Sequence, residues 1–283
     1  KNTPPCTNAL IEHKIKKLFC GTLDPNPKIN GQGIRLLKKA GIQTKVGLLK
    51  KECRQLNKIF FTNQKKLRPY IILKSAQSID GKIALKNGDS NWISNTESRK
   101  DGHRIRSKVK GILVGRGTAE KDNPSLTVRL SKKELGIDKN ETIEQPTKII
   151  IGNLRKSKKN NKLFSNNAKV IIGSRLSAKQ SENLEYIEYK GKNFLEKFLK
   201  DLLARNISSI LVEGGQKTLN SFIANNLFDE LVIYTAPIFL GDGSIKTLSI
   251  KAPDSIKKSS KLKTVKVERF KDDIKTTYYN ENI

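Results

Sequence analysis

The feature that most constrains the fold is an alternation, from Pro69 onward, of β-branched runs with segments of helical periodicity. The runs are continuous and apolar, as in strands buried on both faces of a sheet, and they predict strands at 70–76, 111–115, 147–152, 168–173, 208–213, 230–240 and 264–270. Helical spacing of apolar residues predicts helices at 96–108, 192–205 and 217–226. Together they predict an α/β fold with a mixed, mostly parallel sheet flanked by helices.

The first 67 residues contain shorter and more polar segments. Apolar spacing predicts helices there at 7–19, 31–41 and 51–62, and a strand at 44–49. At Arg68–Pro69 the proline favours extended backbone in the residue before it. Because 283 residues fit two modest domains, we predict a boundary here, with domains at 1–67 and 68–283.

The chain is strongly basic, with 56 Lys and Arg against 27 Asp and Glu and a formal net charge of +29. Nucleic-acid-binding proteins usually gather aromatic and basic residues on one surface, whereas 6% of this chain is aromatic and its basic residues are spread throughout. Nucleic-acid binding is therefore only the non-enzyme alternative, and we predict no nucleic-acid partner. Since no apolar run approaches the ~20 residues of a membrane span, we expect no membrane partner either.

Cysteine and histidine are sparse. Cys6, Cys20 and Cys53 are odd in number and confined to the first fifth of the chain, which favours free thiols and a cytoplasmic location over a disulfide framework. The histidines are His13 and His103, and neither lies in a motif that supports a Ser-His-Asp triad. HExxH and paired CxxC motifs are absent, so a self-contained zinc site is not expected.

Two glycine-rich segments follow predicted strands. The sequence LVEGG at 211–215 precedes a predicted helix, and LVGRGT at 113–118 has the same form. Either segment alone is explained by an ordinary strand-turn-helix connection, and the GxGxxG fingerprint is absent. Two such strand ends in one domain, however, favour a dinucleotide lying across them, with its phosphates at a helix N-terminus.

Two basic residues stand out in the same domain. Lys74 lies within an otherwise apolar strand, where it either points outward from an edge strand or is buried and needs a partner. Arg129 follows a turn and an extended run. An arginine there either clamps a phosphate or lies on the surface.

These segments, taken in order, resemble one family over nearly the whole chain. The matching text is TPPCTNALI (3–11), DPNP (24–27), GQGIRLLKKAGI (31–42), RPYIILKSAQSIDGKIA (68–84), GDSNWIS (88–94), HRIRSKVKGILVGRGTAEKDNPSLTVR (103–129), LVEGGQKTLNSFI (211–223) and LFDELVIYTAPIFLG (227–241). We identify it as similar to the bacterial bifunctional deaminase-reductases of riboflavin biosynthesis.

The resemblance implies two unlike domains. In this family a zinc-dependent deaminase of the cytidine-deaminase type precedes an NADPH-dependent reductase with a dihydrofolate-reductase-like fold. Residues 1–67 are then the C-terminal part of a deaminase domain whose other zinc-binding residues precede Lys1, and 68–283 are the reductase domain. Cys6 matches a zinc ligand that would act only in an intact parent protein, so we expect no deaminase activity from this chain.

The resemblance also implies a reaction and its residues. NADPH would reduce the ribosyl group of 5-amino-6-(5-phosphoribosylamino)uracil to ribityl, in a homodimer. Implied NADPH-binding residues are Ala76, Trp92, Thr118, Asp122, Asn153, Gly215, Gln216, Lys217, Thr218, Leu219, Asn220 and Ser221. Implied substrate-binding residues are Lys74, Ser90, Arg106, Leu126, Arg129 and Glu213, with Lys74 and Glu213 as the catalytic pair. The enzyme alternative is a dihydrofolate-reductase-like protein acting on another pterin or pyrimidine.

Overall fold

The chain forms two compact units, Lys1–Arg68 and Pro69–Ile283, in a computed structural model. The structure describes residues 5–26, 29–154, 162–176, 182–191 and 193–281. None of the helices in these ranges is both long enough and apolar enough to span a membrane. The two units are described separately below.

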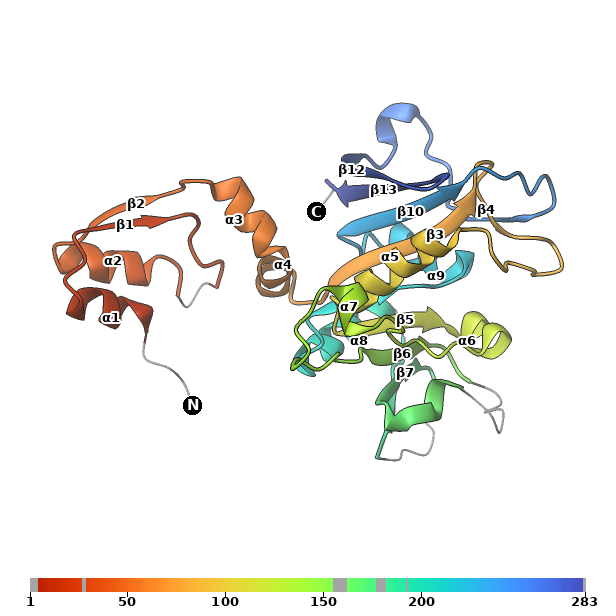
Figure 1. The fold of residues 1–283 in the computed structure, drawn as a ribbon, viewed down its shortest axis with the longest axis horizontal. Helices are drawn as coiled ribbons and strands as arrows, with labels where there is room; N and C mark the ends of the chain where they lie inside the picture. The colour runs from red at the N-terminus through yellow and green to blue at the C-terminus, as the bar shows by residue number, and fades with distance from the viewer. Residues whose placement is uncertain (1–4, 27–28, 155–161, 177–181, 192, 282–283) are drawn as a thin grey trace. The chain divides into compact units, whose positions relative to one another are not determined.

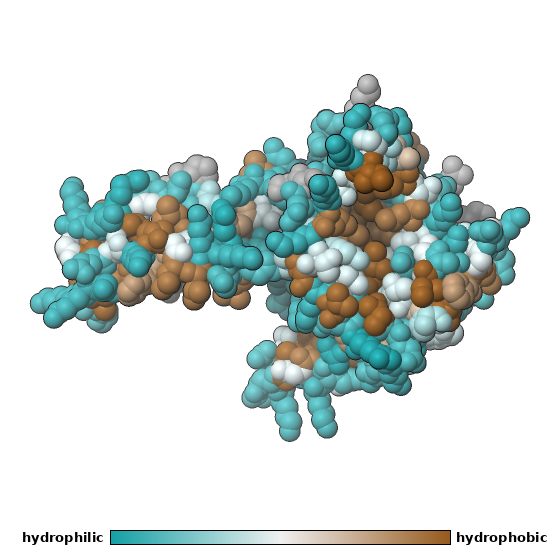
Figure 2. All heavy atoms as spheres, turned by 90° about the horizontal axis from the view of Figure 1, so that it is seen from above, coloured by the Kyte–Doolittle hydropathy of each residue, from teal (hydrophilic) through white to brown (hydrophobic). Residues whose placement is uncertain are grey.

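The first unit has a two-stranded parallel sheet with helices around it (Figure 1). Its elements are α1 (Cys6–Glu12), β1 (Lys17–Cys20), α2 (Gln32–Lys39), β2 (Gln43–Val46), α3 (Lys50–Leu56) and α4 (Lys58–Lys66). Among its described residues, the buried hydrophobic side chains are Leu37 and Ile42, whereas Phe19 and Leu56 are exposed. Apolar side chains reach the surface of this unit in Figure 2. Its hydrophobic core is therefore small.

The second unit is built on a nine-stranded sheet with the strand order β12-β13-β10-β3-β9-β5-β6-β7-β8. The seven strands from β10 to β8 are parallel, and β13 is antiparallel to both β10 and β12. These strands are β3 (Tyr70–Ser78), β5 (Gly111–Gly115), β6 (Thr147–Ile151), β7 (Val170–Ser174), β8 (Leu184–Glu188), β9 (Ser209–Val212), β10 (Glu230–Ala236), β12 (Leu262–Phe270) and β13 (Asp273–Asn280). The short strands β4 (Lys82–Ala84) and β11 (Ile245–Lys246) form a separate antiparallel pair.

Helices cover both faces of this sheet. They are α5 (Thr96–Arg106), α6 (Arg116–Asp122), α7 (Lys132–Leu135), α8 (Phe194–Ala204) and α9 (Gln216–Ala224), with 3₁₀ turns at Lys162–Asn167 and Ile256–Lys258. One core cluster joins α8 and α9 to strand residues such as Leu73 and Val212. A second cluster joins α5 and α6 to Ile112, Val114 and Leu211, and Figure 1 shows α5 crossing in front of β3.

The order of the strands reverses at β9. The chain passes from β3 to β5, β6, β7 and β8, and then returns to place β9 between β3 and β5. In open α/β sheets the crevice beyond the carboxyl ends of the strands at such a reversal is where ligands bind. The residues that follow β3, β9 and β5 are therefore the ones that can form a site.

The predicted mixed, mostly parallel sheet flanked by helices is confirmed, and several element boundaries differ. The predicted helix 7–19 ends at Glu12 and is followed by strand β1, and the predicted helix 51–62 is two helices that meet at Asn57. The predicted strand 230–240 ends at Ala236, before Pro237. Strands β8 and β13 were not predicted, because their apolar positions alternate with polar ones over short stretches. Helix α6 was not predicted because its seven residues include a single apolar side chain, Ala119.

Candidate active site

Lys74 and Glu213 lie at the same level of the sheet. The parallel register pairs Leu73 of β3 with Val212 of β9, and Lys74 and Glu213 are the next residue of each segment. Leu73 and Val212 pack on the α8 and α9 side. Because successive residues of a strand point to opposite faces, Lys74 and Glu213 point to the face that α5 covers.

Arg106, in the last turn of α5, binds the Glu213 carboxylate with two nitrogens. Arg106 Nε donates to Glu213 Oε1 at 2.9 Å, and Nη2 donates to Oε2. Its remaining nitrogen, Nη1, donates to the carbonyl oxygen of Thr127 at 3.0 Å. The side chains of Arg106 and Glu213 are 15% and 12% exposed. This planar two-point contact is the strong form of an ion pair, and it engages three of the five guanidinium N–H groups.

The charges of this cluster shift the pKa values of its members. Burial raises the pKa of Glu213, but the charge and hydrogen bonds of Arg106, together with the charge of Lys74, outweigh burial and hold that pKa at about 2. Burial lowers the pKa of the Lys74 ammonium, the charge of Glu213 raises it, and the net shift is downward. At neutral pH Glu213 is therefore ionised, and Lys74 releases its proton more readily than an exposed lysine does.

Lys74 also lies against an aromatic ring that a buried network holds in place. Its Nζ is 5.4 Å from the centre of the Tyr234 ring, within the range of a cation–π contact. Tyr234 donates its hydroxyl hydrogen to Asp101 Oδ2 at 2.5 Å, and Lys275 Nζ lies 2.6 Å from the same oxygen. Burial and the neighbouring Asp101 raise the pKa of Tyr234, so its hydroxyl stays neutral.

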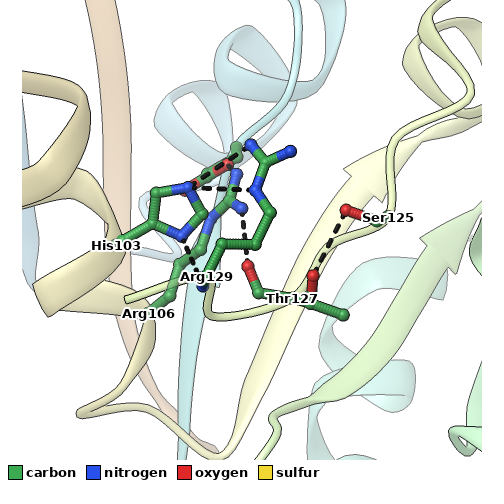
Figure 3. Close-up of polar contacts among 6 residues, drawn as sticks. His103, Arg106, Ser125, Thr127 and Arg129 are labelled. Atoms are coloured by element: carbon green, nitrogen blue, oxygen red, sulfur yellow. Dashed lines mark hydrogen bonds and ion pairs between the residues drawn. The ribbon is translucent and has the colours of Figure 1, made fainter. Parts of the chain in front are cut away.

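His103 and Arg129 face each other beside this cluster (Figure 3). The Arg129 backbone N–H donates to His103 Nδ1 at 3.2 Å, and Nε and Nη2 of Arg129 each lie 3.4 Å from His103 Nε2. Burial and the charges of Arg106 and Arg129 lower the pKa of His103 to about 4. The imidazole is therefore neutral at physiological pH.

Sequence reasoning assigned no role to His103, although a usable signal was present. His103 and Arg106 are three residues apart in a segment that helical spacing predicts to be a helix, and residues at that spacing share a face. Once Arg106 was a candidate, His103 was its neighbour on the same face. Its contact with Arg129 joins segments 26 residues apart, and no local pattern shows such a contact.

The two glycine-rich strand ends lie side by side, because β5 and β9 are adjacent and parallel. Gly115 and Gly214 permit close packing: a Cβ atom on Gly115 would lie 2.3 Å from Thr218 Oγ1, and one on Gly214 would lie 2.5 Å from Thr218 Cβ. Gly215 is the N-cap of α9 and supplies no side chain to the first amides of that helix. A Cβ on Gly215 would meet Thr118 Oγ1 only at 3.8 Å, so the backbone is open there.

The other residues implied for NADPH come from four separate segments of the second unit. Ala76 is two residues beyond Lys74 on β3. Asp122 ends α6, and Asn153 follows β6 and accepts a hydrogen bond from Ser174. Trp92 lies in the segment between β4 and α5 and is 73% exposed. The Cζ atom of Arg99 lies over its ring, 4.1 Å from the ring centre.

Within the segment 215–221, the structure separates structural residues from residues that can contact a ligand. Leu219 is fully buried in the core. Gln216 donates to the carbonyl oxygen of Lys246, and Asn220 both donates to and accepts from the backbone of Ser249. These two side chains therefore hold β11 and the segment that follows it. Lys217 and Ser221 are exposed.

Two of the implied substrate residues have unlike surroundings. Ser90 is exposed in the segment between β4 and α5. Leu126 is 2% exposed and packs in the core cluster beneath α5 and α6, so its side chain faces the protein interior. Its φ of 49° is in the left-handed region, a strained position for leucine that lets the backbone of 125–129 run past Arg106.

The residue implied as a zinc ligand, Cys6, is the first residue of α1 and is an exposed free thiol. Within the part of the chain that the structure describes, no three His, Cys, Asp or Glu side chains form a group that could hold a metal ion.

Comparison with known proteins identifies the family. The model of the RibD C-terminal domain matches residues 69–276. This chain belongs to the RibD family. The riboflavin biosynthesis protein RibD of Aquifex aeolicus is 40% identical over 281 residues, which cover 96% of this chain and 75% of that protein. RibD of Bacillus amyloliquefaciens is 32% identical over 97% of this chain and 74% of its own length.

Solved RibD structures share the fold. A deaminase/5-amino-6-(5-phosphoribosylamino)uracil reductase from Thermotoga maritima superposes with a TM-score of 0.84 at 32% identity, over 98% of this chain and 75% of that one. Acinetobacter baumannii RibD superposes with a TM-score of 0.85 at 27% identity, over 98% of this chain and 76% of that one. The chain is thus a RibD reductase of riboflavin biosynthesis with a dihydrofolate-reductase-like fold.

Proposed function

We propose that the second unit reduces the ribosyl group of 5-amino-6-(5-phosphoribosylamino)uracil to ribityl, with NADPH as the hydride donor. The observation that carries this proposal is the cluster of Lys74, Arg106 and Glu213 at the strand-order reversal, beside the open backbone at Gly215. The substrate is the one named for the Thermotoga maritima relative.

The residues present fit a dinucleotide. The first amides of α9 lack a side-chain cap, and a helix N-terminus with free N–H groups is favourable for a phosphate. Thr118 Oγ1 lies across from Gly215 and adds a hydroxyl donor to the same space. Bound there, NADPH would supply the hydride, while the protein aligns the reactants.

The pKa values of Lys74 and Glu213 support different roles for the two residues. Reduction at the sugar carbon requires a proton as well as a hydride. Glu213, with a pKa of about 2, carries no proton to give at neutral pH. Lys74, whose pKa is lowered by burial, is the group that delivers the proton, and the Glu213 carboxylate holds the ammonium in position.

Arg129 is the residue that binds the substrate phosphate. Arg106 already donates to Glu213 and to Thr127, so it orders the cluster and the 125–129 segment. Arg129 is exposed and contacts His103, which leaves its guanidinium accessible to an anion. We further propose a cytoplasmic homodimer, in line with three free cysteines and with the family resemblance.

The test is the oxidation of NADPH by the purified chain, followed by the loss of NADPH absorbance. We expect turnover with 5-amino-6-(5-phosphoribosylamino)uracil, and a lower KM for NADPH than for NADH. Dihydrofolate and the dephosphorylated pyrimidine serve as controls and should give little or no turnover. Equal turnover with dihydrofolate would favour the alternative reductase, and a failure to bind NADPH would reject the proposal.

A further inference from the structure

Lys74 has different neighbours on its two sides, because β3 lies between β9 and β10 in the sheet. Glu213 follows β9 on one side, and Tyr234 is on β10 on the other. The Lys74 Nζ atom is 5.4 Å from the centre of the Tyr234 ring. The catalytic role proposed above uses the carboxylate on the β9 side and gives no function to the aromatic ring on the β10 side.

The Tyr234 ring belongs to a row of side chains that crosses three neighbouring strands. The register pairs Tyr234 of β10 with Lys275 of β13, and Lys275 with Glu268 of β12. Directly opposite residues of paired strands project from the same face of the sheet. Lys275 Nζ lies 3.3 Å from a carboxylate oxygen of Glu268, so an ion pair ends the row at the outer strands.

Asp101 of α5 holds the row from the helix side. The Tyr234 hydroxyl donates to Asp101 Oδ2 at 2.5 Å, and Lys275 Nζ donates to the same oxygen at 2.6 Å. The side chains of Lys275 and Asp101 are 11% and 13% exposed, so water competes little for these contacts. A hydrogen bond to an ionised acceptor is the strong kind. It fixes the hydroxyl end of the ring, and with it the ring face that Lys74 meets.

Helix α5 also covers the end of the Lys74 side chain. A Cβ atom on Gly102 would lie 3.8 Å from Lys74 Cε and 3.9 Å from Lys74 Nζ, so the helix backbone passes over the ammonium. The titratable and charged groups around this ammonium are Asp101, His103 and Arg106 on α5, Glu213 after β9 and Tyr234 on β10.

These groups act on the pKa of Lys74 in opposite directions. Burial lowers it, the charge of Glu213 raises it, the charge of Arg106 lowers it, and the charge of Asp101 raises it. Each of the two carboxylates is also bound to another cation, Glu213 to Arg106 and Asp101 to Lys275. The charged form of Lys74 therefore depends on both sides of β3.

We propose that Tyr234 and Asp101 are positioning residues that hold Lys74 in place as an ammonium. The ring face attracts the cation, and Asp101 fixes the ring by its hydroxyl and adds a second negative charge. The inference rests on the proposed function, in which Lys74 delivers the proton. It assigns to the β10 and α5 side of the site the task of keeping that proton on Lys74 until the hydride is transferred.

Competitive acetylation with acetic anhydride measures the pKa of Lys74 without substrate or NADPH, because only the neutral amine reacts. Mass spectrometry of the peptide that contains Lys74 gives the extent of labelling at each pH, with exposed lysines of the same sample as the reference. We expect Asp101→Asn and Tyr234→Leu to lower the pKa of Lys74, so that labelling begins at a lower pH. Tyr234→Phe keeps the ring and loses the hydroxyl, so its curve should lie between those of the wild type and Tyr234→Leu.

Lys275→Gln is the matched control, because it breaks the same buried pair from the other side. It removes a cation and leaves the charge of Asp101 without its partner, which should move the pKa of Lys74 upward. A merely structural disturbance would move Asp101→Asn and Lys275→Gln in the same direction, and thermal unfolding shows how far each variant is destabilised. Labelling curves that move together in these two variants, or that stay unchanged in Asp101→Asn and Tyr234→Leu, would overturn the proposal.

The pH profile of kcat gives the second readout. Because the ammonium is the proton donor, a lower pKa of Lys74 removes the donor at a lower pH. The ratio of kcat in the wild type to kcat in Asp101→Asn should therefore rise with pH, and a ratio that is the same at every pH would contradict the inference. Expected labelling shifts in a protein that does not oxidise NADPH would reject the function and keep the positioning role. Normal turnover with unshifted labelling would do the reverse.

Discussion

At the scale of single residues, the site depends on a carboxylate that is buried and yet ionised. Glu213 is held in that state by the two-point contact with Arg106 and by the charge of Lys74. Removing one partner of a buried ion pair leaves the other charge without compensation, which costs more than the pair contributes to stability. Glu213 therefore stabilises the fold in addition to the catalytic role proposed for it.

Glu213→Gln should lower the free energy of unfolding at pH 7 by about 3 kcal/mol, the low end for breaking a buried pair, and should abolish most activity. Urea denaturation measures the first effect. Glu185→Gln is the matched control, because Glu185 pairs with Arg205 at 2.8 Å with both side chains about one-third exposed or less. Loss of the Glu185–Arg205 pair should lower the free energy of unfolding by under about 1 kcal/mol.

The difference in unfolding free energy between the wild type and Glu213→Gln depends on pH in a definite direction. The folded pKa of Glu213, about 2, lies below the ordinary value of 4.5. Its ionisation therefore stabilises the protein fully above about pH 4.5, and this contribution is lost as the pH falls toward 2. The stability gap between the wild type and Glu213→Gln should narrow over that range. A gap that is the same at pH 7 and pH 3 would show that Glu213 is not the buried ionised group.

At the scale of elements, helix α5 places the site residues relative to the sheet. Its N-cap, Asn95, accepts from Ser98 N at 3.1 Å and donates through Nδ2 to the carbonyl oxygen of Phe270 at 2.6 Å. Asp273 accepts from the Asn95 backbone at 2.8 Å and from the Ser98 hydroxyl at 2.6 Å. The turn between β12 and β13 thus anchors the helix that carries His103 and Arg106.

Asn95→Ala should destabilise the protein by about 1–2 kcal/mol, as the loss of an N-cap does, and should also raise KM for the substrate, because the start of α5 is released. Asn280→Ala is the control. Asn280 is the last residue of β13, at the other end of the strand from Asp273, and its Nδ2 donates to Asn226 Oδ1 at 2.7 Å and to the carbonyl oxygen of Phe228 at 3.1 Å. Thermal unfolding and steady-state kinetics give the two readouts. Similar KM values in the two variants would show that α5 is positioned by its core packing alone.

At the scale of the whole molecule, the two units differ in how much apolar surface they bury. The second unit has two core clusters, one on each face of a nine-stranded sheet. In the described part of the first unit, Leu37 and Ile42 are the buried hydrophobic side chains. Burial of apolar surface is the main stabilising contribution to folding, so the first unit should open more readily.

Limited proteolysis with trypsin should therefore leave a resistant fragment that begins near Pro69. Lysine and arginine occur throughout both units, so the difference in cleavage reports local opening rather than the number of available sites. Mass spectrometry of the fragments, together with hydrogen exchange, measures it. Equal protection on both sides of Arg68 would mean that the first unit is stabilised by contacts beyond its small core.

The sequence by itself determined the fold class, and it singled out Lys74 and the two glycine-rich strand ends as candidates for a site. Strands such as β5 and β6 are continuous β-branched runs, because each is buried on both faces. The glycines at 115 and 214 were visible as strand ends, since only glycine allows the close approach of Thr218. Lys74 was visible because a cation inside an apolar strand requires a partner.

The tertiary structure alone decided which residues meet. Arg106 and Glu213 are 107 residues apart, and they pair because β9 returns between β3 and β5. The same return commits Arg106 to Glu213, and it places His103 and Arg129 beside that pair. Local periodicity records which face of an element is buried. It carries no information about which distant segment covers that face, because this depends on the order of strands in the sheet.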